Sequence, residues 1–351
     1  MTDQTDQTDE AREAAEAREG SEAREARETR PTAAVPEGEL LHERLLADLR
    51  PVAFGIAYRM LGSVTEAEDV VQEALLRVHR SIEAGEQLAS PRAFTATVTT
   101  RLAMDELRSA RARRERYVGD WLPEPILTDG RAADLDPARQ GETADTLSMA
   151  LLVVLESLSP EQRAVLLLHD VFGYAYAEVA SIVGKGEANV RQLAVRARRH
   201  VEDRRPRFTT TPEQQSELAN RFFAAARTGD LAGLESLLAH DVELVGDGGG
   251  KAPSLARSQR GRSRVAHTLT NWLRVLRRLP EMEIRPAEVN GGPGATFLVE
   301  GHLMAVWALE IRDGQVAGVR AIVNPDKLAH LGPVGDANAL IRRLGGARPG
   351  D

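Results

Sequence analysis

Residues 159–199, SPEQRAVLLLHDVFGYAYAEVASIVGKGEANVRQLAVRARR, decide the fold of the middle of the chain. Ser159, Pro160 and Gln162 form a helix start, with a cap, a proline at the first helical position and a capping-box acceptor. A second, short helix should end at Gly184, and Gly186 should cap a third. The third helix has apolar residues at helical spacing, namely Val190, Leu193 and Ala197. The pattern predicts a helix-turn-helix.

The opposite face of the third helix is polar and basic. It carries Asn189, Arg191, Gln192, Arg196 and Arg199. Asparagine and glutamine pair with an adenine edge, and arginine pairs with guanine or phosphate. Residues 187–207 hold seven arginines and three acids, a local net charge of +4 (7 minus 3). We therefore expect a major-groove recognition helix; the alternative is a small helical domain with a solvated basic face.

Composition limits the possible classes of protein. A chain of 351 residues with 42% hydrophobic content should contain two or three domains. The net charge is −8, but acid gathers at the N-terminus and in a linker while arginine gathers in two clusters. The absence of cysteine excludes disulfides and thiolate chemistry, and the histidines lack metal-ligand spacing, so no metal or cofactor is expected. With no signal peptide and no long apolar run, a cytoplasmic protein without membrane contact is expected.

Two helical segments precede the linker. Residues 1–37 are acidic repeats that should be disordered, and residues 38–116 form the first helical domain. A capping box at Thr65 and Glu68 predicts the start of its second helix. That helix exposes an acidic and polar face, formed by Asp69, Gln72 and Glu73.

A long basic helix should begin at Ser90 and Pro91. Its expected buried positions are Phe94, Val98 and Leu102, and Phe94 is interpreted as a core residue. Residues 92–116 carry seven arginines and three acids, again a net charge of +4 (7 minus 3). Two separate basic helices suggest a protein that holds two sites on one DNA.

Residues 117–142 read as a linker, because proline, glycine and aspartate are frequent and no periodicity survives. The string WLPEP interrupts it: Trp121 and Leu122 offer an apolar anchor, and Pro123 stiffens the segment. Residues 143–205 then form the second helical domain, which contains the helix-turn-helix.

Residues 212–332 form a third domain, followed by a tail at 333–351. Helices at its start give way to four short strands, 281–289, 295–301, 302–314 and 315–323, with RDGQ as a hairpin turn. We therefore expect a multidomain chain: two all-α DNA-binding domains and an α+β cone. Within the cone, the string DGGGK at 247–251 has three glycines that permit positive φ and close approach, and Lys251 supplies charge.

Three stretches carry a resemblance to a known family. Residues 57–80, 90–117 and 158–199 resemble regions two and four of bacterial extracytoplasmic-function sigma factors. WLPEP (121–125), DGGGK (247–251) and NPDKL (324–328) resemble the sigma-J-like subgroup, whose fused C-terminal domain is similar to SnoaL-like (NTF2-like) folds. The resemblance covers residues 39–205 and, through these strings, the third domain.

The resemblance implies roles for particular residues. Asp69, Gln72 and Glu73 would dock on the clamp helices of core RNA polymerase. Promoter DNA would be held at its −10 element by Arg92, Arg101, Arg108 and Arg111, and read at its −35 element by Asn189, Arg191, Gln192, Arg196 and Arg199. The third domain would replace a separate anti-sigma protein. Its regulatory contacts would involve Trp121, Leu122, Pro123, Asp247, Gly248, Gly249, Gly250, Lys251, Asn324, Pro325, Asp326 and Lys327.

Two other functions stay open at this point. One is a one-component regulator that senses a small molecule in the cone. The other is an isomerase or cyclase, since related folds use a carboxylate inside the cone as a general base. The ionisable candidates for such a site are Asp241, Asp247, Glu300 and His302. No acid and base are visibly paired, so no enzymatic activity is expected.

Overall fold

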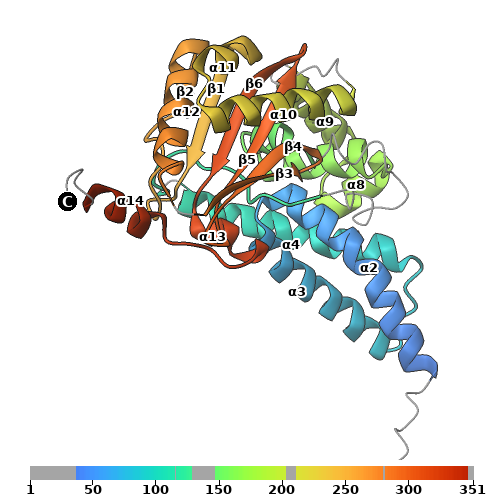
Figure 1. The fold of residues 1–351 in the computed structure, drawn as a ribbon. Coiled ribbons are helices and arrows are strands. Elements are labelled where there is room, and N and C mark those ends of the chain that lie inside the picture. The colour runs from blue at the N-terminus through green and yellow to red at the C-terminus, as the bar shows by residue number, and fades with distance from the viewer. Residues whose placement is uncertain (1–36, 115, 129–146, 203–210, 280, 347–351) are drawn as a thin grey trace, which may run out of the picture. The chain divides into compact units, whose positions relative to one another are not determined.

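The computed structural model describes residues 37–114, 116–128, 147–202, 211–279 and 281–346 (Figure 1). Three helices come first: α2 (Glu37–Leu61), α3 (Val64–Glu83) and α4 (Pro91–Arg114). α3 and α4 pack side by side, with Val71, Ala74 and Val78 of α3 buried. The expected disorder of residues 1–37 concerns a segment that lies, but for its last residue, outside the described residues.

The start of α3 corrects one prediction from the sequence. The helix begins at Val64, and Ser63 caps it by accepting a hydrogen bond from the Glu66 backbone N–H at 3.1 Å. The expected cap at Thr65 is therefore two residues too late. Ser63 prevails because a distant carboxylate also satisfies the next two backbone N–H groups, as described below.

The buried face of α4 differs from the expected one. Phe94, Val98 and Leu102 are only half-buried. Leu102 packs against the apolar core, but Phe94 does not belong to it, so the interpretation of Phe94 as a core residue is wrong. The buried positions are small or threonine side chains together with two longer ones: Thr95, Ala96, Thr99, Thr100, Ala103, Met104 and Leu107. The Thr95 hydroxyl donates to the Pro91 carbonyl at 2.8 Å, so a polar side chain can be buried on this face.

The second helical segment has the predicted helix-turn-helix. It contains α6 (Met149–Leu155), α7 (Pro160–Leu166), the π-helical turn η2 (Leu167–Val171), α8 (Tyr176–Val183) and α9 (Glu187–Glu202). The capping box of Ser159 and Gln162 is present in both directions. Gly184 ends α8 in the left-handed region at φ 69°. Ala175 gives α8 no side-chain cap, but the Glu178 carboxylate accepts from the Ala175 N–H at 2.8 Å.

The two helical segments share one apolar core. Ile56, Met60 and Leu61 of α2 pack in the same cluster as Leu151 and Leu155 of α6. Arg163 of α7 is only 2% exposed, and it donates to the Met60 carbonyl at 2.5 Å and to the Glu156 carboxylate at 3.0 Å. A buried arginine with both partners in place joins the segments by polar contacts as well as by apolar burial.

The C-terminal part is built around a six-stranded sheet. Its elements are α10 (Pro212–Thr228), α11 (Leu231–Leu237), β1 (Leu238–Asp247), β2 (Gln259–Arg260), α12 (Arg262–Leu276), β3 (Met282–Val289), β4 (Gly292–Val299), β5 (His302–Arg312), β6 (Gln315–Ile322), α13 (Pro325–Leu328), the 3₁₀ turn η3 (Ala329–Leu331) and α14 (Ala337–Gly346). The strand order is β2-β1-β6-β5-β4-β3. Only β1 and β6 pair in parallel; the other pairs are antiparallel.

The two faces of the sheet are covered differently. Helices α10, α11 and α12 cover one face, where Phe222 and Phe223 meet Phe297 and Trp307 in a core filled by aromatic rings (Figure 1). On the other face a separate apolar cluster joins Leu122 of the linker and Met149 of α6 to strand residues, namely Val245, Val289, Leu303, Val306, Ala308 and Ile322. Two helical domains followed by an α+β domain confirm the predicted fold class.

Candidate functional site: the linker junction and the predicted DNA-binding helices

The strings WLPEP, DGGGK and NPDKL lie together at one junction. Asp247, at the end of β1, is fully buried. Its carboxylate accepts from the Tyr117 hydroxyl at 2.5 Å, from the Leu122 backbone N–H at 2.8 Å and from Lys327 Nζ at 2.7 Å. Residues up to 210 positions apart (327 minus 117) therefore meet on a single carboxylate. We call this group of four residues the junction.

Lys327 is the cation of the junction. Its ammonium also donates to the Leu122 carbonyl, and it lies 4.0 Å from the centroid of the Trp121 ring. Asn324 caps α13 through its side chain and donates to the Tyr117 hydroxyl at 2.8 Å. Burial, together with the Asp247 carboxylate, raises the pKa of Tyr117 far above its usual value, so the phenol remains a donor.

The glycines of DGGGK allow the linker to approach. Gly249 has φ 56°, and a Cβ there would lie 2.3 Å from the Asn324 amide nitrogen and 2.8 Å from the Tyr117 hydroxyl. Any side chain at this position would push the linker away. Lys251, at the other end of the string, pairs instead with Asp326 on the surface of the same domain. Lys251 was expected to contact the helical part of the chain, but its ion pair is with the C-terminal domain itself.

A second set of contacts fixes the linker to the start of α3. The Glu124 carboxylate accepts from the Ser63 hydroxyl at 2.8 Å, the Val64 N–H at 2.7 Å and the Thr65 N–H at 3.2 Å. The Glu124 N–H donates to the Gly62 carbonyl at 2.8 Å. Nothing in the sequence pointed to Glu124, because its partners lie about 60 residues earlier in the chain.

Replacing Glu124 with glutamine should lower the free energy of unfolding by about 1–2 kcal/mol, because a helix start loses a charged acceptor. Urea titration followed by tryptophan fluorescence measures this change. The control is Glu86→Gln, since Glu86 is exposed in the loop after α3 and its replacement should change stability by less than about 0.5 kcal/mol. Equal effects of the two variants would contradict the capping role of Glu124.

Asn290 makes a third set of contacts at the β3–β4 turn. This residue is fully buried, with φ 54°. Its side chain accepts from the Ile126 N–H at 3.1 Å and donates to the Tyr58 hydroxyl at 2.6 Å and the Leu147 carbonyl at 3.2 Å. Beside it, Thr128 pairs with Glu288 of β3 through backbone and side chain. One amide thus joins α2, the linker and the segment before α6 to the sheet.

The predicted recognition face of α9 is exposed. Asn189, Arg191, Gln192, Arg196 and Arg199 all lie on the surface, and Val190, Ala194 and Ala197 are buried behind them. Arg191 pairs with Glu187 one turn earlier. Val195, which sequence reasoning missed, is 62% exposed within this polar face. Val195 lies three residues after Gln192, and this helical spacing could have placed it on the same face of α9.

The predicted −10 residues are placed differently. Arg101 donates to the carbonyls of Ile182 at 3.0 Å and Ser181 at 2.9 Å, at the end of α8. Arg108 pairs with Asp105 at 2.7 Å and with Glu161 of α7 at 3.0 Å. These two arginines are therefore engaged with the second helical segment. Arg92 is exposed, and the side chain of Arg111 lies outside the described residues.

The predicted polymerase-binding face is on α3. Asp69 and Gln72 are exposed, and Glu73 pairs with Arg77 at 2.7 Å across one turn. Leu76 lies next to this face and is also exposed. The three residues therefore share a surface, as their spacing implied.

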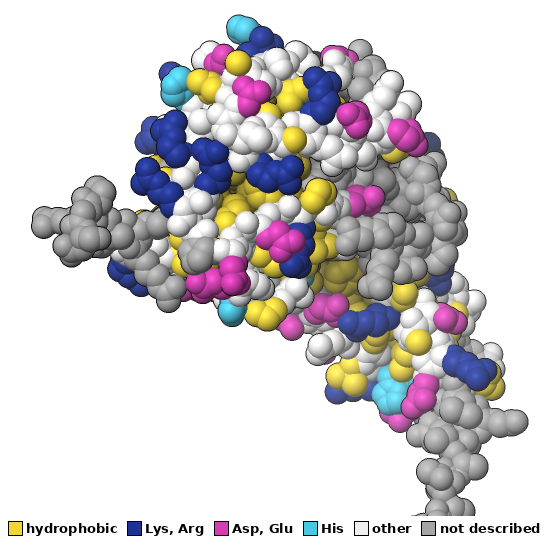
Figure 2. Space-filling view, in the orientation of Figure 1, with side chains coloured by type: hydrophobic (Ala, Val, Ile, Leu, Met, Phe, Trp, Pro, Cys, Tyr) yellow, Lys and Arg dark blue, Asp and Glu magenta, His cyan; other side chains and the backbone are white. Residues whose placement is uncertain are grey.

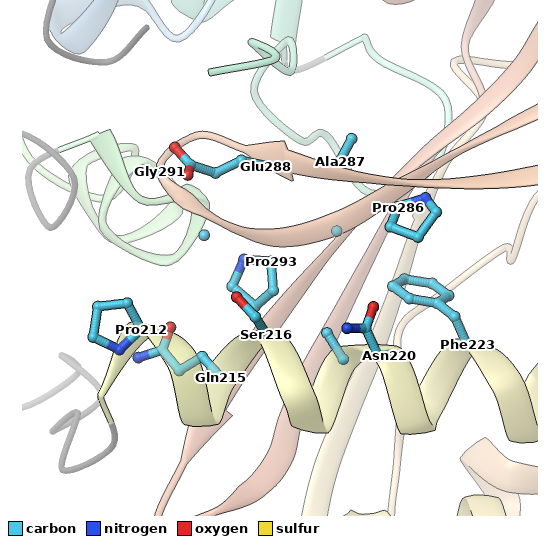
Figure 3. Close-up of a pocket in the computed structure, with 13 residues that line it drawn as sticks. Pro212, Gln215, Ser216, Asn220, Phe223, Pro286, Ala287, Glu288, Gly291 and Pro293 are labelled. Carbon is cyan, nitrogen blue, oxygen red and sulfur yellow. The ribbon is translucent and has the colours of Figure 1, made fainter. Parts of the chain in front are cut away.

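A cavity of about 310 Å³ lies between α10 and the β3–β4 hairpin. Gln215, Ser216 and Asn220 of α10 line it opposite Glu288 and Pro293 (Figure 3). None of the four ionisable residues proposed for a cone site lines this cavity. Asp241 pairs with Arg312 on the surface, Glu300 and His302 are exposed at a turn, and Asp247 belongs to the junction.

Two features are absent from the described part of the chain. No group of three or more His, Asp or Glu side chains is arranged there to hold a metal ion. Within the same ranges, no helix has both the length and the apolar character needed to cross a lipid bilayer.

The comparisons with known proteins agree with this architecture. Residues 45–113 match the family model of sigma-70 region 2, and residues 148–201 match that of sigma-70, region 4. Two such regions on one chain define a sigma factor. Proteins of this class bind core RNA polymerase and promoter DNA.

Individual relatives narrow the class. The chain is 41% identical over 289 residues to the ECF RNA polymerase sigma factor SigJ of Mycobacterium tuberculosis, covering 80% of this chain and 90% of that one. It is 32% identical over 295 residues to the probable ECF sigma factor SigI of the same species, covering 83% and 93%. The crystal structure of SigJ matches with a TM-score of 0.64 at 37% identity, covering 80% and 96%. The chain belongs to the extracytoplasmic-function (ECF) RNA polymerase sigma factors.

Proposed function

We propose that this sigma factor directs promoter-specific initiation under the control of its fused C-terminal domain, which takes the place of a separate anti-sigma protein. The domain holds the linker, and the linker in turn is fixed to the helices that bind polymerase and DNA. The chain acts in the cytoplasm without catalysis of its own. Promoter opening and RNA synthesis are reactions of the polymerase to which it binds.

The junction at Asp247 is the observation that carries this proposal. A carboxylate with no exposed surface requires its cation and its donors, because an unpaired buried charge costs several kcal/mol. Tyr117, Leu122 and Lys327 supply them from the linker and from α13. The linker therefore cannot leave the sheet without exposing or breaking this pair.

The contacts of Arg101 and Arg108 support a closed, inhibited arrangement. If these residues hold the −10 element, they must first leave the carbonyls at the end of α8 and the Glu161 carboxylate. An arginine that already bonds to groups of its own chain is not available to bind a DNA phosphate. Separation of the two helical domains over the two promoter elements would require release of the linker and opening of the apolar core that the domains share.

Run-off transcription tests both parts of the proposal. The reaction contains core polymerase and the DNA upstream of the chain's own coding sequence, with the wild-type protein or the Asp247→Ala variant. We expect a transcript that depends on the added protein, and more transcript with the variant. No transcript from either protein would contradict sigma activity on this DNA. Equal transcript from both, with the linker released in the variant, would contradict control by the C-terminal domain.

Val195 provides a separate prediction about promoter reading. Its exposed methyl groups lie among the polar residues of α9, where an apolar contact with a thymine methyl fits. Uracil lacks the methyl group of thymine, so each thymine of the −35 element is replaced with uracil in turn. At the one position that Val195 contacts, the affinity of the wild-type protein for the promoter should fall roughly fourfold, the effect expected for one buried methyl group.

The Val195→Ala variant should bind the thymine and uracil promoters nearly equally. Ile341→Ala is the control, because Ile341 is also an exposed apolar residue but lies on α14. Fluorescence anisotropy with labelled promoter fragments gives the affinities. A thymine preference that persists in the Val195→Ala variant would show that another residue contacts the methyl.

A further inference from the structure

The segment around α12 is a third basic region of the chain, and neither DNA-facing helix contributes to it. Residues 252–279 contain no Asp or Glu. They contain seven arginines: Arg257, Arg260, Arg262, Arg264, Arg274, Arg277 and Arg278. The net charge of this segment is +7, higher than that of either predicted DNA-binding helix.

The helix presents part of this charge as a stripe. Arg264, His267, Asn271 and Arg274 recur every three or four residues, and Arg278 follows just after the helix. All five are exposed, while Val265, Leu269 and Leu273 are buried against the sheet domain. Lys and Arg side chains gather over α12 and β2 in the space-filling view (Figure 2). From Arg264 to Arg274 the stripe is about 15 Å long at the rise of an α-helix.

The acids of the neighbouring elements do not neutralise this surface. On β1, Glu243 pairs with Arg260 and Arg320, and Asp241 pairs with Arg312. On α11, the Asp230 side chain caps the helix, and Glu235 is half-buried. The acids of α10, Glu213 and Glu217, lie in its first two turns. Among the described residues, no carboxylate pairs with Arg257, Arg264 or Arg278.

We propose that this surface, defined by Arg257, Arg264, Asn271, Arg274 and Arg278, binds the phosphate backbone of promoter duplex DNA. Arginine and asparagine are side chains that contact phosphate, and about 15 Å corresponds to roughly half a turn of duplex. The inference rests on the membership of this chain in the sigma factor family. It holds whether the C-terminal domain inhibits or activates transcription.

Other polyanions fit this surface less well. Single-stranded nucleic acid is held by exposed rings of Trp, Tyr and Phe, but Trp272, the only residue of these three types in α12, is half-buried and packs near Trp307. A membrane-binding helix inserts large apolar side chains, whereas this face offers only Val275. Contacts to phosphate alone carry no sequence information. The surface would therefore strengthen binding to any promoter without changing its selection.

The salt dependence of DNA binding tests the proposal. Holoenzyme is assembled with wild-type protein, with the double variant Arg264→Gln/Arg274→Gln, or with the control Arg221→Gln/Arg285→Gln. Both control residues are exposed and lie outside α12. Affinity for the chain's own promoter fragment is measured by anisotropy at several salt concentrations. Loss of two phosphate contacts should lower the slope of log K against log salt by about 1.8 and weaken binding on the order of tenfold at physiological salt.

The control pair should leave the slope and the affinity unchanged. If the α12 variant behaves as wild type, or if both variants lose affinity equally, the proposal is wrong. The α12 variant should still support transcription by the holoenzyme at low salt. A variant that loses transcription at low salt as well has lost sigma activity, which is a different outcome from the loss of phosphate contacts.

A photo-crosslinker at Asn271, in the middle of the stripe, identifies the occupant directly. Transfer of label to the promoter DNA of the holoenzyme complex is the expected result. Transfer to a polymerase subunit, or to the acidic residues 1–36 of this chain, would identify a protein partner and overturn the proposal.

Discussion

The Asp247→Ala variant is expected to lose about 100-fold of the hydrogen-exchange protection at the backbone N–H of Leu122. The substitution leaves Lys327 buried without its carboxylate and removes the acceptor of two further hydrogen bonds. Breaking a buried pair by removing one partner costs about 3–5 kcal/mol, of which we assign about 3 kcal/mol to the docking of the linker. Exchange measured by mass spectrometry over residues 117–128 reports this local opening.

Lys251→Ala is a matched control from the same DGGGK string. Lys251 and Asp326 form a surface pair whose side chains are 57% and 59% exposed. Solvent screens such pairs, so the change should cost less than about 1 kcal/mol, and protection of the linker should remain near the wild-type level. If Lys251→Ala releases the linker as much as Asp247→Ala does, the buried pair is not what holds it.

The Asn290→Ala variant is expected to unfold at clearly lower urea concentration, with a loss of about 3 kcal/mol. Three hydrogen bonds disappear, and the half-buried Ile126 N–H, the buried Tyr58 hydroxyl and the buried Leu147 carbonyl each lose a partner, at about 1 kcal/mol or more for each group. Alanine must also adopt the left-handed backbone conformation of Asn290, a smaller cost. Urea titration with tryptophan fluorescence and far-ultraviolet circular dichroism measures the loss.

Asp313→Ala separates the backbone cost from the side-chain cost. Asp313 has φ 51°, precedes a glycine in the β5–β6 turn and is exposed, so it shares the backbone conformation of Asn290 while its side chain is not buried. Its replacement should cost about 1 kcal/mol. Similar losses in the two variants would show that the amide of Asn290 does not join the helical part to the sheet.

Local signals in the sequence predicted the elements well. The capping box at Ser159, the left-handed end of α8 at Gly184 and the RDGQ turn all depend on residues within four positions of one another. Such interactions form wherever the local sequence is present. The three strings of the junction were identified by resemblance, but their meeting on Asp247 could not be derived from spacing.

The errors and omissions have tertiary causes. The buried face of α4 was assigned to Phe94, Val98 and Leu102, whereas the buried side chains there are mostly alanine and threonine, with Met104 and Leu107. Small side chains allow close packing against the neighbouring helices α3, α7 and α8. Glu124, Asn290 and the internal contacts of Arg101 were missed because their partners are between about 60 and 232 residues away. The sequence around a polar side chain does not show which distant group will be its hydrogen-bond partner.

The junction also sets an order of events during synthesis. Lys327 and Asn324 lie near the end of the chain, while Tyr117 and Leu122 lie in its first half. Domains fold from the N-terminus as the ribosome releases them, so both helical domains fold before the cation that holds the linker has been made. A nascent chain that has not reached Lys327 therefore has its linker unheld by the sheet, although the contacts between its two helical segments can already form. If the C-terminal domain controls initiation as proposed, each molecule comes under that control only after Lys327 has been translated.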